Sequence, residues 1–172
     1  LNNITSYDLL ANLLSHLILN KKNEKLIFDL DYLIKNQLDE LGVHKSYNIL
    51  EHSKNLNNFN ELKNLLLYFN KDLSKAVKGT LIKMTSILNE YFHDDGSIPL
   101  FNGSNNNYTK IIHDSINREE YLKSRKYDDN VNGIAFYKDK NKKIFFDVVQ
   151  PTKDKLNSNL SAGTLSIELS GF

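Results

Sequence analysis

The stretch His93-Asp94-Asp95-Gly96-Ser97 separates two parts of the chain that have different hydrophobic patterns. Before it, apolar residues recur every three or four positions, which is the spacing of amphipathic helices. After it, short runs rich in β-branched and aromatic residues lie between turn residues, which is typical of strands. The stretch itself combines Asp, Gly and Ser, which favour turns. We therefore predict an α+β chain, with a helical part over residues 1–94 and a β-rich part over residues 95–172.

Four apolar stripes before this turn predict helices over residues 9–18, 27–41, 59–69 and 73–91. Ser6 or Thr5 is suited to cap the first helix, and Gly42 follows the second, where a left-handed residue often ends a helix. Gly79 lies inside the fourth stripe, where close packing against another helix would favour a glycine. Helices with one apolar face and short connections must pack on one another to bury those faces.

Four runs after the turn predict strands over residues 98–101, 133–137, 143–149 and 164–170. In the last run Leu165, Ile167 and Leu169 alternate with polar residues, so they share one face. Residues 139–142 have the composition of a hairpin turn. The polar segment 103–130 predicts a long surface excursion or a poorly ordered loop.

The overall composition excludes several classes of function. The 172 residues carry 22 Lys or Arg and 21 Asp or Glu, a net charge of +1, which is no electrostatic footprint for nucleic acid. The apolar runs are far shorter than the roughly 20 residues of a spanning helix, so we expect no membrane insertion. The absence of cysteine excludes disulfides and fits periplasm and cytoplasm equally. The first residue is Leu1 and the last run is a strand without a closing turn, so we expect a fragment of a longer protein.

The loop Gly42-Val43-His44-Lys45-Ser46-Tyr47-Asn48 holds the side chains best suited to chemistry. A histidine beside a hydroxyl, a phenol and an amide can supply a base, an acid and donors for a carboxylate within a few residues. From composition alone, the simpler interpretation is a polar loop whose Ser46 caps the next helix.

Other catalytic signatures are missing from the sequence. There is no HExxH motif, no phosphate-binding glycine loop and no nucleophile elbow. His44 and His52 do not have a recognised metal-ligand spacing. We therefore expect no metal and no cofactor.

Three segments in order resemble the heparinase II/III family of polysaccharide lyases, especially its compact bacterial branch. The first resembles a helix end followed by Gly-His-Val-Ser-Arg-Asn-Pro, the second resembles Asp-Gly-Gly-Leu-Ala-Leu-Phe-Asn-Gly, and the third resembles His-Ala-Gly-Thr-Leu-Ser-Phe-Glu-Leu-Ser. In this chain they are Gln37-Leu38 with 42–48, then 95–103, then 161–170. The resemblance spans roughly residues 26 to 170.

The resemblance implies an incomplete α/α toroid followed by an antiparallel β-sandwich, with the polysaccharide bound where the two meet. This chain would then hold helical hairpins from the C-terminal part of the toroid and the first strands of the sandwich. The helix-then-strand order predicted from periodicity is consistent with that architecture.

The resemblance also implies a lyase that cleaves an acidic, uronate-containing polysaccharide, such as a glycosaminoglycan, by β-elimination. His44 matches a toroid motif position and is expected to neutralise the substrate carboxylate or act as a base. Tyr47 stands where the branch usually has Arg, and its phenol is the expected partner in proton transfer. Asn48 and Ser161 are the expected substrate-binding residues. Ser161 replaces the histidine that begins the family strand, and a serine hydroxyl cannot act as a general base at neutral pH.

Two other functions compete with the lyase. The Ser161 departure motivates a glycan-binding protein of the same fold that has lost catalysis. An unrelated helical interaction module with an appended β segment would bind no glycan.

Overall fold

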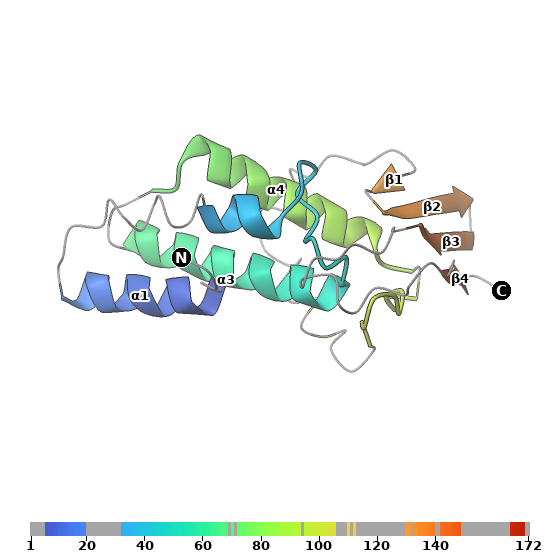
Figure 1. The fold of residues 1–172 in the computed structure, drawn as a ribbon, viewed down its shortest axis with the longest axis horizontal. Helices are drawn as coiled ribbons and strands as arrows, with labels where there is room; N and C mark the ends of the chain where they lie inside the picture. The colour runs from blue at the N-terminus through green and yellow to red at the C-terminus, as the bar shows by residue number, and fades with distance from the viewer. Residues whose placement is uncertain are drawn as a thin grey trace.

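The computed structural model describes residues 6–19, 32–68, 70, 72–93, 95–105, 110, 112, 130–131, 133–139, 142–148 and 166–170. Three long helices lie side by side, and a sheet stands at one end of them (Figure 1). The α+β class predicted from the hydrophobic pattern is confirmed, because helices α1, α3 and α4 precede Tyr91 and the described strands follow Gly103.

Two of the predicted helices form nearly as expected. Helix α1 covers Ser6–Ile18, and helix α4 covers Lys75–Glu90. The hydroxyl of Ser74 caps α4 by accepting a hydrogen bond from the Val77 amide at 3.2 Å. Gly79 does not serve close packing, as its pattern suggested, because a Cβ placed there would have no neighbour within 4 Å.

The third helix, α3, covers Ile49–Tyr68 and therefore begins well before the predicted stripe of residues 59–69. Its first half shows no apolar stripe, because several of the side chains that it buries are polar, among them His52, Ser53 and Asn55. Helices that are covered on more than one side lose the simple apolar stripe. Asn48, not Ser46, caps α3: its Oδ1 accepts from the amides of Leu50 and Glu51.

The predicted helix over residues 27–41 is shorter at its C-terminal end than expected. Helical conformation is described for residues 32–37, and Leu38 then pairs with His44 in an isolated β-bridge. Asp39 ends the helix because its carboxylate accepts from the amides of Leu41 and Val43. Ile27 and Leu30 lie outside the described residues.

The dividing turn forms as predicted. The His93 amide donates to the Ser97 carbonyl, and Asp95 accepts from both the amide and the hydroxyl of Ser97. Residues 98–101, however, pair with no strand, so that strand prediction is wrong. Pro99 has no amide hydrogen for a ladder. Ile98 and Phe101 instead bury their side chains in the core.

The four described strands form one antiparallel sheet in the order β1-β2-β3-β4. The strands are β1 (Asn130–Val131), β2 (Ile134–Asp139), β3 (Lys142–Asp147) and β4 (Ser166–Ser170). The predicted hairpin joins β2 and β3, since Asp139 pairs with Lys142. The segment 103–130 was predicted to be a surface excursion or loop. Within it Ile112 is buried, and strand β1 begins at its last residue. Residues 113–129 lie outside the described part.

One face of the sheet packs against the C-terminal end of α4. Phe145 stacks with Tyr91 at a ring-centre distance of 6.5 Å, and it meets the edge of the His93 ring at 4.8 Å. The ammonium of Lys143 is buried and donates to the carbonyls of Glu90 and Phe92. A cation at a helix C-terminus is favoured by the helix dipole, so Lys143 joins the sheet to α4.

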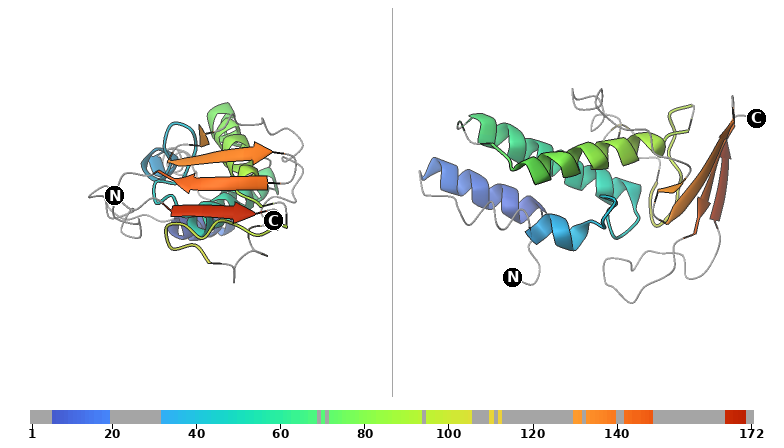
Figure 2. Two further views of the ribbon diagram at one scale, coloured as in Figure 1. Left: turned by 90° about the vertical axis from the view of Figure 1, so that its right-hand side faces the viewer. Right: turned by 90° about the horizontal axis from the view of Figure 1, so that it is seen from above.

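The opposite face of the sheet is covered by no described element (Figure 2), and its central residues are apolar. The pairing register places two cross-strand rows on it. Ile167 and Leu169, which the alternation placed on one face, are 50% and 54% exposed there. The apolar residues of this outer face are Ala135, Tyr137, Ile144, Phe146, Ile167 and Leu169, and the polar Asn130, Asp139 and Lys142 share it.

Candidate functional site

The loop that carries the candidate residues is a tight turn built on Asp39 and Gly42. The amide of Asp39 donates to the Val43 carbonyl, and the Lys45 amide donates to the Gln37 carbonyl. Gly42 adopts φ +90°, which residues with a Cβ rarely adopt. This geometry turns the chain back sharply enough to direct His44 into the protein rather than toward solvent.

His44 is buried, with 4% of its surface exposed. Its Nδ1 accepts the Ser46 amide at 3.2 Å and lies 2.7 Å from the Ser46 hydroxyl. Burial, together with the nearby His52 and Lys45, lowers the pKa of His44 to about 3. The imidazole is therefore neutral at pH 7 and is a poor Brønsted base.

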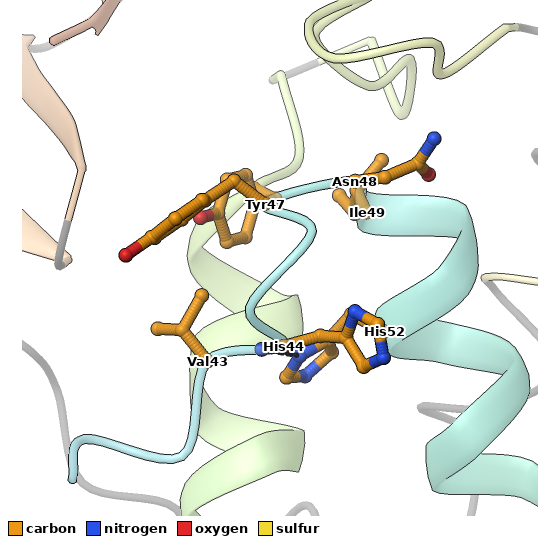
Figure 3. Close-up of a pocket in the computed structure, with 7 residues that line it drawn as sticks. Val43, His44, Tyr47, Asn48, Ile49 and His52 are labelled. Atoms are coloured by element: carbon orange, nitrogen blue, oxygen red, sulfur yellow. Dashed lines mark hydrogen bonds between the residues drawn. The ribbon is translucent and has the colours of Figure 1, made fainter. Parts of the chain in front are cut away.

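A second histidine, His52 on α3, lies beside His44 and is also buried. It accepts the backbone amide of His44 at Nδ1, and its Nε2 lies 2.9 Å from the Met84 carbonyl of α4. Burial lowers the pKa of His52 to about 4, although the Met84 hydrogen bond and Asp39 oppose the shift. Figure 3 shows the two rings next to each other beneath the loop.

Tyr47 is partly exposed and adopts φ 51°, in the left-handed region. Its side chain extends away from the two imidazoles (Figure 3). Burial, followed by the charge of Asp39, raises the pKa of the phenol. The pKa of Tyr91, at the end of α4, is also raised by burial and by Asp39, Asp147 and Tyr47. Both phenols therefore keep their protons at neutral pH.

Asn48 joins the loop to the segment that follows the dividing turn. Its Nδ2 donates to the Asn102 carbonyl at 2.8 Å, and Asn102 Nδ2 donates to the Tyr47 carbonyl at 3.3 Å. The Ser104 hydroxyl also contacts Asn48 Oδ1, at 3.3 Å. Asn48 and Asn102 are both buried, and Asn102 also has a left-handed φ, of 54°. The first two segments of the family resemblance thus meet through reciprocal hydrogen bonds.

A small pocket of about 170 Å³ lies at this junction. That volume includes open solvent, and the space between the lining side chains does not hold a water-sized sphere, so a substrate group can contact the pocket only at its surface. It contains three of the four predicted site residues, and Ser161 lies outside the described part of the chain. Its lining is Val43, His44, Tyr47, Asn48, Ile49, His52 and Tyr91.

Three residues of this site were not singled out for chemistry by the sequence: His52, Tyr91 and Asn102. Tyr91 and Asn102 lie far from the loop in sequence, and His52 lies in the first half of α3, which the periodicity did not predict. The contact between His52 and His44 cannot be predicted from their spacing in the sequence, because it depends on how α3 packs on the loop. Asn102 had one available signal, since Phe101-Asn102-Gly103 belongs to the second resemblance segment.

Metal binding and membrane spanning find no support in the described residues. There, no three His, Asp or Glu side chains cluster closely enough to hold an ion. None of the described helices combines the length and hydropathy that a membrane span requires. Comparison with protein-family models, with curated proteins and with solved structures finds no match to this chain.

Proposed function

We propose that this chain is part of a heparinase II/III-like carbohydrate-active protein that cleaves an acidic polysaccharide by β-elimination. The observation that carries the proposal is a pair of hydrogen bonds, from Asn48 to the Asn102 carbonyl and from Asn102 to the Tyr47 carbonyl. It brings two segments of the family resemblance together beside the pocket that His44 and Tyr47 line. In the family the polysaccharide lies where helices and sheet meet, and the pocket is lined by the loop, the start of α3 and Tyr91 at the end of α4.

The toroid and the sandwich belong to the same proposal. Helices α1, α3 and α4 would be part of the toroid wall, and the sheet would be the first layer of the sandwich. The apolar outer face of the sheet supports a second layer, because sheets of a sandwich bury apolar inner faces against each other. Contiguous exposed apolar surface of this kind usually marks an interface.

β-Elimination sets three tasks for the site. A base removes the C5 proton, and the electrons of that C–H bond form a C4–C5 double bond. The C4–O bond then breaks, and its electron pair stays on the leaving oxygen, which takes a proton. Stabilising the charge that develops on the uronate carboxylate lowers the barrier to the first step.

We assign two of these tasks. The neutral imidazole of His44 would donate a hydrogen bond to the carboxylate, because a pKa of about 3 makes it a poor base. The Tyr47 phenol, protonated because its pKa is raised, would give its proton to the leaving oxygen. Asn48 would assist substrate binding through the amide hydrogen that it does not donate to Asn102. The base is left to residues outside this assignment.

The experiment measures ultraviolet absorbance of the unsaturated product while the protein is incubated with alginate, heparin and other uronate polymers. We expect His44→Ala to abolish turnover and Tyr47→Phe to reduce it by about 100-fold or more. His44→Gln keeps an N–H near the Nε2 position and should retain part of the activity. Circular dichroism and the melting temperature show whether each variant folds.

Tyr68→Phe is the matched control, because Tyr68 is 81% exposed at the end of α3 and should leave turnover unchanged. A wild-type protein that turns over a uronate polymer while Tyr47→Phe and His44→Ala keep full activity would remove both residues from the mechanism.

A glycan-binding protein without catalysis is the second candidate, and two observations favour it. His44 is a poor base, and Ser161 stands where the family has a histidine. This candidate predicts measurable binding to acidic oligosaccharides by calorimetry without any absorbance change. Absence of binding to every acidic glycan would instead favour the helical interaction module.

A further inference from the structure

A chain of hydrogen bonds runs from α4 through α3 to the candidate loop. The Met84 carbonyl can only accept, so the Nε2 of His52, 2.9 Å away, carries a hydrogen and donates it. The other ring nitrogen of neutral His52 is then an acceptor, which matches the donation from the His44 amide at 3.3 Å. Both ring nitrogens of His52 are thereby used, and its tautomer follows from its two partners.

The position of the His44 proton also follows from its hydrogen-bond partners. The Ser46 amide can only donate, so the Nδ1 of His44 that receives it holds no hydrogen. The Ser46 hydroxyl, 2.7 Å from the same nitrogen, must also donate to it, and its oxygen is free to accept the Asn48 amide at 3.2 Å. In the neutral ring the remaining hydrogen lies on Nε2.

We propose that Ser46 and His52 are positioning residues that hold His44 as a neutral Nε2–H donor, so that this site takes a carboxylate through an uncharged hydrogen bond. Ser46 sets the tautomer, and His52 ties the backbone of His44 to α4. The group recognised is an acceptor oxygen, and its identification as a uronate carboxylate rests on the proposed function.

The surroundings of His44 support an uncharged donor. A protonated imidazole would lose the donation from Ser46 to Nδ1 and would be buried at 4% exposure. Lys45 and His52 both disfavour a positive charge on His44. The titratable groups around the ring are Asp39 and Lys45 in the turn, Tyr47 in the loop, His52 on α3 and Tyr91 at the end of α4.

The tautomer is tested directly by ¹⁵N NMR of the histidine rings in the full chain, between pH 5 and pH 8. We expect His44 to show a protonated Nε2 and an unprotonated Nδ1 throughout. In Ser46→Ala only the longer backbone donor remains on Nδ1, so Nδ1 should begin to take up a proton at the acidic end of the range. Ser86→Ala is the control, since it removes another buried hydroxyl, one that donates to Ile82 within α4.

The role of His52 is tested by two variants that each keep one of its hydrogen bonds. His52→Asn keeps an acceptor near the His44 amide, and His52→Gln keeps a donor near the Met84 carbonyl. We expect His52→Asn to bind alginate oligosaccharides within about threefold of wild type and His52→Gln to bind them about tenfold more weakly. Melting temperatures separate this difference from a general loss of stability, which would affect both variants alike.

The charge of the donor is tested by the pH dependence of that binding. A neutral donor predicts nearly constant affinity from pH 5 to pH 8, and weaker binding of carboxyl-reduced oligosaccharides. Affinity that rises steeply as the pH falls, or a proton on Nδ1 at pH 7, would overturn the proposal. If the NMR result holds but no acidic oligosaccharide binds, the positioning of His44 stands, whereas the carboxylate assignment and the proposed function both fail.

Discussion

Gly42 and Gly79 differ in what a side chain would meet at each position. Gly42 has φ +90°, and a Cβ there would lie 3.1 Å from Lys83 Cβ on α4. Gly79 lies within α4 and would place its Cβ in open space. The first glycine is required by the turn that buries His44, and the second is required by no contact in the structure.

The two glycines predict opposite changes in stability. Gly42→Ala should lower the free energy of unfolding by about 1–2 kcal/mol from the left-handed backbone alone, with more from the contact with Lys83. Gly79→Ala should raise it by about 0.5–1 kcal/mol, because alanine restricts the unfolded chain and favours helix. Urea denaturation of both variants measures the two changes. Equal effects of the same sign would show that the backbone angle of Gly42 is unimportant.

At the scale of secondary-structure elements, the start of α3 links the helices to the segment that leads to the sheet. Asn48 caps α3 with its Oδ1 and donates its Nδ2 to the Asn102 carbonyl. Lys143 makes a second connection, from β3 to the carbonyl of Glu90, the last residue of α4, and to that of Phe92 just beyond it. Helix ends and sheet are therefore joined by polar side chains as well as by the apolar contacts around Phe145.

Asn48 variants separate the cap from the cross-connection. Asn48→Ala should cost about 2 kcal/mol of unfolding free energy, because it removes the N-cap and one buried hydrogen bond. Asn48→Asp keeps the capping oxygen but loses the donation to Asn102. We therefore expect its loss of unfolding free energy, measured by thermal or urea unfolding, to be about half that of Asn48→Ala. If the Asp variant is as unstable as the Ala variant, the cap contributes little.

At the scale of the whole molecule, the buried histidines make stability depend on pH. The pKa of His44 is lowered to about 3 and that of His52 to about 4, against 6.5 for an unperturbed histidine. The unfolded state therefore binds more protons than the folded state between these values. Stability is full above pH 6.5 and decreases as the pH falls toward 4, by up to about 1.4 kcal/mol per pH unit for each histidine.

Melting temperatures measured between pH 7.5 and pH 4 test this dependence. The wild type should lose stability steadily below pH 6.5, and His52→Gln should show a shallower slope because one of the two groups is gone. Asn12→Ala, at an exposed position of α1 and without a titratable group, is the control and should keep the wild-type slope. A wild-type melting temperature that does not change down to pH 4 would mean that the two rings are not buried as neutral groups.

The predicted function stays a proposal, whereas much of the secondary structure could be predicted from local patterns. Helices α1 and α4, the turn around Gly96, and strands β2, β3 and β4 follow from residues within a few positions of one another. The first half of α3 was missed because its buried polar residues conceal the period. The strand expected at 98–101 was wrong because Ile98 and Phe101 find burial without a ladder partner.

Periodicity and turn chemistry therefore determine where helices and strands form, since those preferences act between neighbouring residues. The tertiary structure alone decides that His44 is buried beside His52, that Asn48 bonds to Asn102, and that Ile167 and Leu169 face away from the helices. Those outcomes depend on contacts between segments far apart in the chain. These contacts contribute energy only when the segments pack together, so local sequence patterns cannot predict them.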